Sequence, residues 1–189
     1  MPESRYPLGM DASERIEAAT ARLCPDCGLC CNGVLYSSVR LQSEDNPAHL
    51  ELLGLALQPE DSGRSFSQPC VMHDGSLCRI YPERPARCRQ FRCRVLEDVI
   101  AGAIPPLQAQ RAIRSAREQS ARVRALLRQF GDHDESKPLS RRCQPFLDHI
   151  VNPGNAPDFV KLRGELLLAV HQLTQTLKSS FYPGGNGSL

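Results

Sequence analysis

The sequence predicts a mainly helical α+β fold, in which an irregular cysteine-rich core with a small hairpin is followed by a C-terminal helical extension. Two observations lead to this prediction. Eight of the nine cysteines lie within the first 93 residues, among many turn-forming residues. The second half instead carries apolar residues at three- and four-residue spacings, which is the pattern of amphipathic helices.

The N-terminal third predicts one clear helix and several short elements. Asp11 or Ser13 can cap a helix that ends near Leu23. Pro25 and the glycines that follow it predict an irregular loop over residues 24–33. A strand over residues 34–41, a short helix within 47–57 and a loop over 61–68 should come next.

The next cysteine-bearing segment, residues 70–81, predicts a hairpin. Asp74 and Gly75 favour the positive φ angles of a tight turn at its tip. A three-residue loop centred on Asp74 would place Cys70 directly opposite Cys78. This geometry would bring two sulfurs to one side of the hairpin.

The remaining chain predicts helices. Pro82 and Pro85 suit the first turn of a helix that carries Cys88 and ends before Pro105. Long apolar stripes predict two further helices, over residues 106–130 and 158–181. We therefore expect a cysteine-cluster module over residues 11–104, a helical extension packed on it over 105–181, and a disordered tail over 182–189.

Composition limits the classes of function. The chain has 189 residues, 41% of them hydrophobic, which is enough for a core. Its N-terminus lacks the apolar stretch of a signal peptide, and the longest apolar run, residues 166–170, is far too short to span a bilayer. We therefore expect a cytoplasmic protein with no membrane partner. In a reducing cytosol, clustered cysteines bind metal or perform redox chemistry more often than they form disulfides.

The spacing of the first cysteines is typical of metal ligands. Cys24 and Cys27 form a C-x-x-C pair, whose two sulfurs can reach one ion from a single turn. Adding Cys30 gives C-x-x-C-x-x-C, which also occurs in small iron–sulfur proteins. Thiolates suit both zinc and iron. The candidate metal ligands are Cys24, Cys27, Cys30, Cys31, Cys70, Cys78, Cys88 and Cys93.

The number of metal sites stays open at this point. Cys30 and Cys31 are adjacent, so in an extended segment their side chains point to opposite sides. Cys88 and Cys93 would lie about 140° apart around an unbroken helix, so either a helix begins between them or they face different partners. Eight cysteines would satisfy two four-thiolate sites, or one cluster with some free thiols. Cys143 stands alone, and we expect it to be a buried apolar residue rather than a ligand.

Positive charge is concentrated in the middle of the chain. The formal charge is −6 over residues 1–78, +8 over 79–128 and 0 over 129–189. Arginines near the last cysteines can balance the negative charge of a thiolate-bound metal. We interpret those within 111–128 as a solvated helix face in preference to a phosphate-binding stripe. A nucleic-acid partner for the arginine-rich segment 79–128 is therefore the weaker hypothesis.

Two other groups of polar residues are weaker candidates for metal binding. His73 lies between two cysteines and could be a ligand, although a histidine at a hairpin tip is more often exposed. Residues 132–135, Asp-His-Asp-Glu, have the composition of a cation site but not the spacing of a calcium loop. We interpret them as a polar linker.

The combined cysteine motifs resemble a known family. The C-x-x-C-x-x-C-C run is followed by Pro69-Cys70, by Cys78-Arg-Ile-Tyr81 and by Arg84-Pro-Ala-Arg-Cys88-Arg89. This pattern is similar to the YkgJ-type CxxCxxCC cysteine-cluster family of zinc- or iron-chelating proteins. The resemblance covers about residues 24–93 and implies metal chelation by the eight cysteines. Flagellin lysine methylases contain a related cluster, but they are much longer chains.

The leading hypothesis is a protein that chelates zinc or iron, with an iron–sulfur cluster as one form of the bound metal. Its role could be structural, storage, delivery or cluster carrying, and we lean against an enzyme. One alternative is an iron–sulfur or metal-dependent enzyme related to flagellin lysine methylases. The other is a zinc-stabilised adaptor for protein or RNA.

Overall fold

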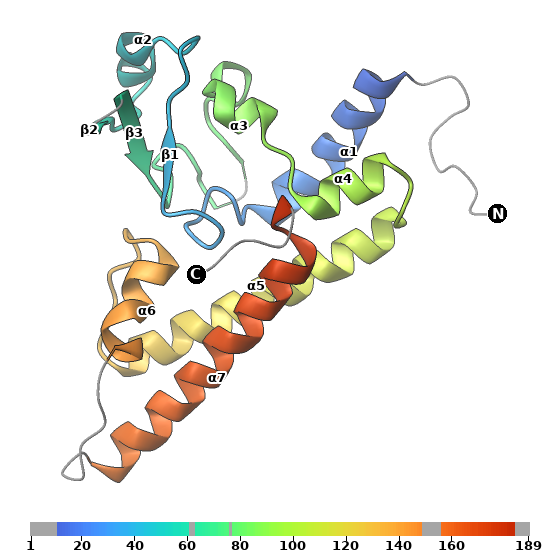
Figure 1. The fold of residues 1–189 in the computed structure, drawn as a ribbon. Coiled ribbons are helices and arrows are strands. Elements are labelled where there is room, and N and C mark those ends of the chain that lie inside the picture. The colour runs from blue at the N-terminus through green and yellow to red at the C-terminus, as the bar shows by residue number, and fades with distance from the viewer. Residues whose placement is uncertain (1–10, 61–62, 76, 149–155, 184–189) are drawn as a thin grey trace.

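The computed structural model describes residues 11–60, 63–75, 77–148 and 156–183 (Figure 1). Within these ranges the chain forms helices, one 3-10 turn and a small antiparallel sheet, so the predicted mainly helical α+β class is confirmed. The helical elements are α1 (Ala12–Cys27), α2 (Pro47–Leu52), the 3-10 turn η1 (Tyr81–Glu83), α3 (Ala86–Gln90), α4 (Arg94–Ile100), α5 (Pro106–Gln129), α6 (Leu139–Leu147) and α7 (Pro157–Ser180).

Helix α1 begins where the sequence predicts and ends later. The Asp11 side chain accepts a hydrogen bond from the Glu14 amide at 2.9 Å, and the Glu14 carboxylate accepts one from the Asp11 amide at 2.8 Å. This capping box fixes the start of the helix. The predicted end near Leu23 is wrong, because the helix continues through Pro25 to Cys27. Gly28 ends it in the left-handed conformation, with φ of 64°.

The sheet has the strand order β1-β3-β2, with β1 (Ser38–Arg40), β2 (Gln58–Glu60) and β3 (Gly63–Ser67). Only the end of the predicted strand 34–41 is in the sheet. The predicted loop over 61–68 is wrong, since most of it forms the central strand β3. Phe66 on this strand is buried opposite Val39 of β1. Its apolar side chain explains why a strand forms in an otherwise polar segment.

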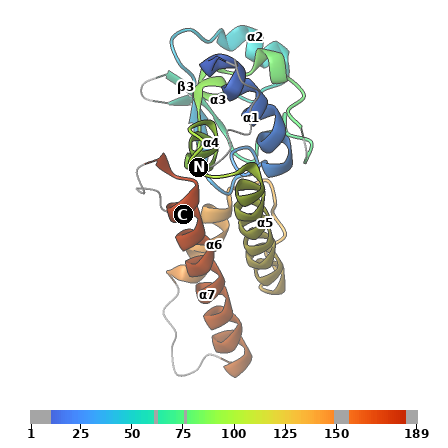
Figure 2. The same ribbon diagram turned by 90° about the vertical axis from the view of Figure 1, so that its right-hand side faces the viewer.

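The two long helices lie as predicted, within one or two residues. Helices α5 and α7 run antiparallel and pack along their length, as both views show (Figures 1 and 2). Helices α1 and α4 pack against α5 at the end where it begins, and α6 covers the other end. Helix α6 was not predicted, because its apolar residues span little more than two turns.

The buried residues form two separate cores. The larger core lies where α1, α4, α5, α6 and α7 meet. The smaller core lies between α2, the sheet and the hairpin, and it consists of Leu50, Leu55, Phe66, Met72 and Ile80.

The chain returns to the larger core after α7. Phe181 is fully buried, and Tyr182 is 6% exposed. The Tyr182 hydroxyl donates a hydrogen bond to the Leu35 carbonyl at 2.9 Å. Tyr182 is thus part of the core, although we expected a disordered tail from residue 182. Residues 184–189 lie outside the described residues.

Candidate metal centre

All eight candidate cysteines line one cavity of about 520 Å³. Each is a free thiol of intermediate exposure, neither fully buried nor fully open to solvent. They come from the end of α1, the loop after it, the hairpin, α3 and the residue before α4. The fold therefore gathers thiols that are up to 69 positions apart in the sequence, from Cys24 to Cys93.

The end of α1 presents the first cysteines. Cys24 and Cys27 lie on the last turn of the helix, so the predicted irregular loop is wrong for residues 24–27. The Gly28 amide donates to the Cys24 carbonyl at 3.2 Å, and the Gly28 carbonyl accepts from Cys31 at 2.9 Å. These bonds make a tight turn that presents Cys30 and Cys31 to the cavity.

The hairpin approaches the first cysteine block directly. The Cys70 amide donates to the Cys31 carbonyl at 2.8 Å, which ties the two blocks together. The predicted hairpin is reduced to one isolated antiparallel bridge, between His73 and Cys78, and the described residues of this segment form no strand. The predicted pairing of Cys70 with Cys78 is therefore wrong; we keep the name hairpin for residues 70–81. The Arg79 backbone amide donates to the Met72 carbonyl at 2.9 Å. Both cysteines still reach the cavity, from different positions along the hairpin.

The chain breaks between Cys88 and Cys93, which answers one question that the sequence left open. Cys88 lies on the short helix α3, whereas Cys93 is the N-cap of α4, in an extended conformation. Cys88 packs against the smaller core and Cys93 against the larger one. The two thiols therefore face different surroundings.

Contacts divide the eight thiols into two sets. Cys24, Cys27, Cys30 and Cys93 pack against the larger core, and we name them the first set. Cys70, Cys78 and Cys88 pack against the smaller core. Cys31 is hydrogen-bonded to Cys70 through the backbone, so we add it to these three as the second set. The boundary between the sets runs between the adjacent residues Cys30 and Cys31.

Burial controls the protonation of these thiols. It is the main cause that raises the pKa of Cys24 to about 11 and the pKa values of Cys27, Cys31 and Cys88 to about 12. Other thiols add to the effect: Cys93 raises the pKa of Cys24, and Cys70 and Cys78 raise that of Cys31, with a smaller contribution to Cys31 from Cys24 of the first set. The metal-free thiols of Cys24, Cys27, Cys31 and Cys88 are therefore protonated at neutral pH, and a bound metal would have to displace their protons.

In this structure the cysteine side chains are not arranged as the ligands of a metal ion. Across the described residues, no group of three or more His, Cys, Asp or Glu side chains is arranged to hold a metal ion. The shared cavity nevertheless brings the thiols into one region. Ligation would require the sulfurs to move closer together.

Arginines surround the cavity. Arg84, Arg87, Arg89 and Arg92 all line it. Within the ranges that the structure describes, none of these four forms an ion pair with a carboxylate. Arg84 stacks on Tyr81, 3.7 Å from the ring centre, and its charge partly offsets the raised pKa values of Cys24, Cys31 and Cys88. These cations can compensate negative thiolate charge.

Two arginines of α5 hold the cysteine segment, residues 24–32. Arg117 donates a hydrogen bond to the Asp26 carbonyl, and Arg124 donates one to the Asn32 carbonyl at 3.0 Å. The predicted solvated face is correct for the exposed Arg111, Arg114, Arg117, Arg122 and Arg128, although Arg117 also makes this contact, and it is wrong for Arg124, which is partly buried. The signal that sequence reasoning missed is the position of the two arginines beside the apolar stripe of the helix.

His73 is closer to the centre than the sequence suggested. Its side chain lines the cavity, and its Nε2 atom is buried without a hydrogen-bond partner among the described residues. Burial lowers the pKa of the imidazole, which favours its neutral form. A Cβ atom on Gly28 would lie 3.1 Å from this Nε2 atom. His73 therefore lies against the turn between Cys27 and Cys30.

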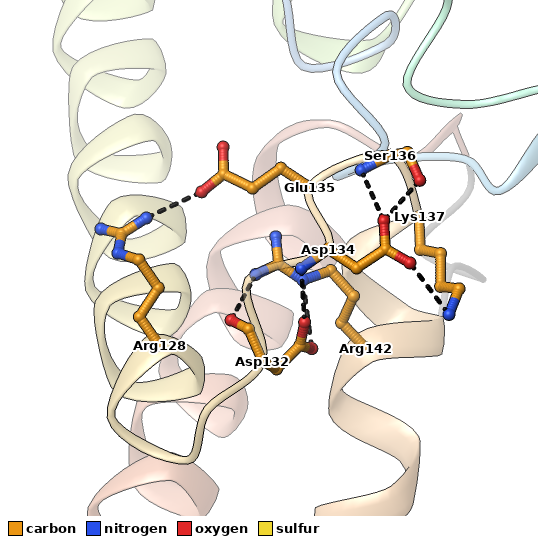
Figure 3. Close-up of polar contacts among 7 residues, drawn as sticks. All are labelled: Arg128, Asp132, Asp134, Glu135, Ser136, Lys137 and Arg142. Carbon is orange, nitrogen blue, oxygen red and sulfur yellow. Dashed lines mark hydrogen bonds and ion pairs between the residues drawn. The ribbon is translucent and has the colours of Figure 1, made fainter.

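The acidic segment 132–135 is occupied by internal ion pairs (Figure 3). Asp132 pairs with the buried Arg142 at 3.2 Å, and Glu135 pairs with Arg128 at 2.8 Å. Asp134 pairs with Lys137 at 2.9 Å. These carboxylates stabilise the connection between α5 and α6, which agrees with their interpretation as a polar linker.

Cys143 is separate from the other thiols. It lies on α6 in the larger core with 2% exposure, and it does not line the cavity. Burial raises its pKa to about 12, so the thiol is neutral. The prediction that it is a buried apolar residue is confirmed.

A cavity lined by eight thiols defines a class of site that suits thiophilic metals such as zinc and iron. A family model described as "CxxCxxCC: Putative zinc- or iron-chelating domain" matches residues 23–122, more than half of the chain. The protein belongs to this family. Comparisons with curated proteins and with solved structures gave no match. In the part of the chain that the structure describes, no helix has both the length and the apolar character needed to cross a membrane.

Proposed function

We propose that the protein chelates zinc or iron through two adjacent four-thiolate sites. The first set, Cys24, Cys27, Cys30 and Cys93, would hold one metal. The second set, Cys31, Cys70, Cys78 and Cys88, would hold the other. The observation that carries the proposal is the grouping of the eight cavity-lining thiols: four contact the larger core and three contact the smaller core, and Cys31 is tied to the latter by its backbone hydrogen bond with Cys70.

The donor chemistry fits these metals. Zinc is bound by four cysteines in many structural sites, and iron–sulfur clusters are also held by four cysteine thiolates. Among the described residues that line the cavity, Glu60 is the one with a carboxylate, and it is already paired with Arg40 at 3.0 Å. Hard cations such as Mg²⁺ and Ca²⁺ prefer oxygen ligands, so they do not suit this site.

The charge balance also fits. A divalent ion with four thiolates carries a net charge of about −2, so two such sites would carry about −4. The four cavity arginines without carboxylate partners among the described residues, Arg84, Arg87, Arg89 and Arg92, can offset this charge. The metal-free cavity would then hold an excess of positive charge, which favours thiolate formation as the metal enters.

A second candidate function is an enzyme that uses an iron–sulfur cluster or another bound metal. The cavity favours it, because about 520 Å³ lies within the size range of small-molecule sites. An enzyme would need part of this volume to stay open after the metal binds. We also infer a reducing, cytoplasmic compartment, because the thiols must stay reduced to act as ligands.

Cobalt titration tests the proposal. Co²⁺ is a spectroscopic substitute for Zn²⁺, and its bands report thiolate ligation and tetrahedral geometry. We expect thiolate-to-cobalt absorption to grow until two equivalents are bound. In the double variant Cys70→Ser, Cys78→Ser, it should stop at one equivalent. Saturation at one equivalent in the unaltered protein would contradict the two-site arrangement.

A further inference from the structure

The two cysteine sets pack against cores of different size. The first set contacts the larger core, which joins five helices. The second contacts the smaller core of five buried residues. Regions with few buried apolar contacts open locally at a much lower free energy than the main core of a protein. The second set should therefore open more often than the first.

The backbone around the first set is firmly anchored. Cys24 and Cys27 belong to a 16-residue helix, and Cys93 begins α4. The amide that follows Cys93, that of Arg94, donates to the Phe181 carbonyl at 3.1 Å, which attaches this ligand to the end of α7. From the side of α5, Arg117 donates to the carbonyl of Asp26, which lies between Cys24 and Cys27. Separating these four thiols would require the helices to come apart.

The backbone around the second set has weaker anchors. Cys70 and Cys78 lie on a hairpin whose apolar side chains Val71 and Leu77 are 50% and 53% exposed. Cys88 lies on α3, which has only five residues. Helices this short are not stable without tertiary contacts. Movement of the hairpin alone would take two of the four thiols away from the cavity.

We propose that the second set is the exchangeable metal site and the first set is the retained one. This inference rests on the proposed function, because it assumes that both sets hold metal. Metal would pass from the second set to a competing chelator in solution without any redox change. Each metal–sulfur bond that breaks is replaced by a bond to the chelator, and each released thiolate takes up a proton from water. The protein would thus deliver one metal while the other maintains the fold.

The test uses full-length protein loaded with two equivalents of zinc under anaerobic conditions. An excess of a coloured zinc chelator is added, and zinc transfer is followed by absorbance. We expect two phases of equal amplitude, the first at least about tenfold faster than the second. The double variant Cys70→Ser, Cys78→Ser should retain one zinc and show only the slow phase. A single phase that releases both zinc ions together would overturn the inference.

Thiol labelling of the unaltered protein identifies the site without relying on a variant that folds poorly. One equivalent of zinc is removed, exposed thiols are alkylated with a maleimide, and labelled peptides are identified by mass spectrometry. Label should appear on Cys31, Cys70, Cys78 and Cys88. Label appearing first on Cys24, Cys27, Cys30 or Cys93 would overturn the assignment. A protein that binds no zinc before the chelator is added would instead contradict the proposed function itself.

Discussion

Arg117 and Arg124 connect α5 to both ends of the cysteine segment. Each guanidinium donates to a backbone carbonyl, one at Asp26 and the other at Asn32. These contacts fix the path of the backbone on which four of the eight thiols lie. The contact partners are 91 and 92 residues apart in the sequence, so helical periodicity could show only that the arginines lie off the apolar stripe. Their function as anchors depends on the tertiary fold.

Replacing Arg124 with glutamine should weaken metal retention. The Asn32 carbonyl would lose its donor, and outer hydrogen bonds of this kind change metal affinity by about 10- to 100-fold. Affinity is measured by competition with a zinc chelator. Arg122→Gln is the matched control, because Arg122 is exposed on the same helix. Equal affinity of the two variants would show that Arg124 does not hold the segment.

Cys143 provides a test of which thiols bind metal. Cys143→Ser should leave the metal content unchanged, because this thiol lies in the larger core away from the cavity. It should lower the free energy of unfolding by about 1–3 kcal/mol, since a buried hydroxyl would lack a partner. Cys27→Ser should reduce the metal content. Metal analysis and denaturant unfolding of both variants measure these effects, and metal loss in Cys143→Ser would refute the assignment.

At the scale of elements, length and periodicity decide what sequence reasoning could predict. Helices α5 and α7 are long and strongly periodic, and their predicted bounds were nearly correct. The strands have three to five residues, too few for a period to be recognised. Helix α1 extends beyond its predicted end near Leu23, because its last turn contains Pro25 and continues to Cys27. Such local choices depend on contacts with distant residues rather than on propensity.

The turn at Gly28 should be sensitive to a single methyl group. Gly28 has φ of 64°, and a Cβ atom there would lie 3.1 Å from His73 Nε2. Gly28→Ala should therefore lower both the melting temperature and the affinity for metal. Its backbone strain should cost about 1–2 kcal/mol. Gly102→Ala is the control, because Gly102 has φ of 72° but nothing within 4 Å of the added methyl group.

Calorimetry and zinc competition would separate the two effects. Both variants should lose stability through the shared backbone strain. Only Gly28→Ala should also lose metal affinity, because of the two turns only this one lies between thiols that we propose as metal ligands. Equal losses of affinity in both variants would show that the turn has no special relation to the site.

On the scale of the whole molecule, contacts with the two cores, together with the hydrogen bond between Cys31 and Cys70, determine how the thiols are grouped. The sequence divides the cysteines into a block before residue 32 and a block after residue 69. The fold exchanges one member of each block, because Cys93 joins the first three cysteines and Cys31 joins the hairpin. The adjacency of Cys30 and Cys31 suggested two sites, but their membership required the tertiary fold. We further propose that residues 105–181 form a helical extension that stabilises the module of residues 11–104.

The raised thiol pKa values predict opposite pH responses of metal-free and metal-loaded protein. Burial raises the pKa of Cys24 from 9.0 to about 11 and that of Cys27 to about 12. The folded state therefore binds these protons more tightly than the unfolded state does. Stability from the neutral thiols is fully present below about pH 9 and is lost as pH rises towards the folded pKa values.

Thermal unfolding at a series of pH values measures this response. The melting temperature of the metal-free protein should fall from about pH 8 to about pH 10. The metal-loaded protein should change less over this range, since its thiolates already hold metal. It should lose stability in acid, where protons compete for the thiolates. Parallel curves for the two forms would contradict the assignment of buried thiols as ligands.

The most direct test of metal chelation by the eight cysteines is the metal content of anaerobically purified protein, measured together with its absorption spectrum. We predict tightly bound zinc or iron at no less than one metal per chain. Colourless protein with zinc would support a structural or delivery role, whereas brown protein with iron and sulfide would support a cluster carrier or enzyme. A stably folded, metal-free protein whose eight cavity thiols all titrate freely and which takes up neither zinc nor iron would contradict the account.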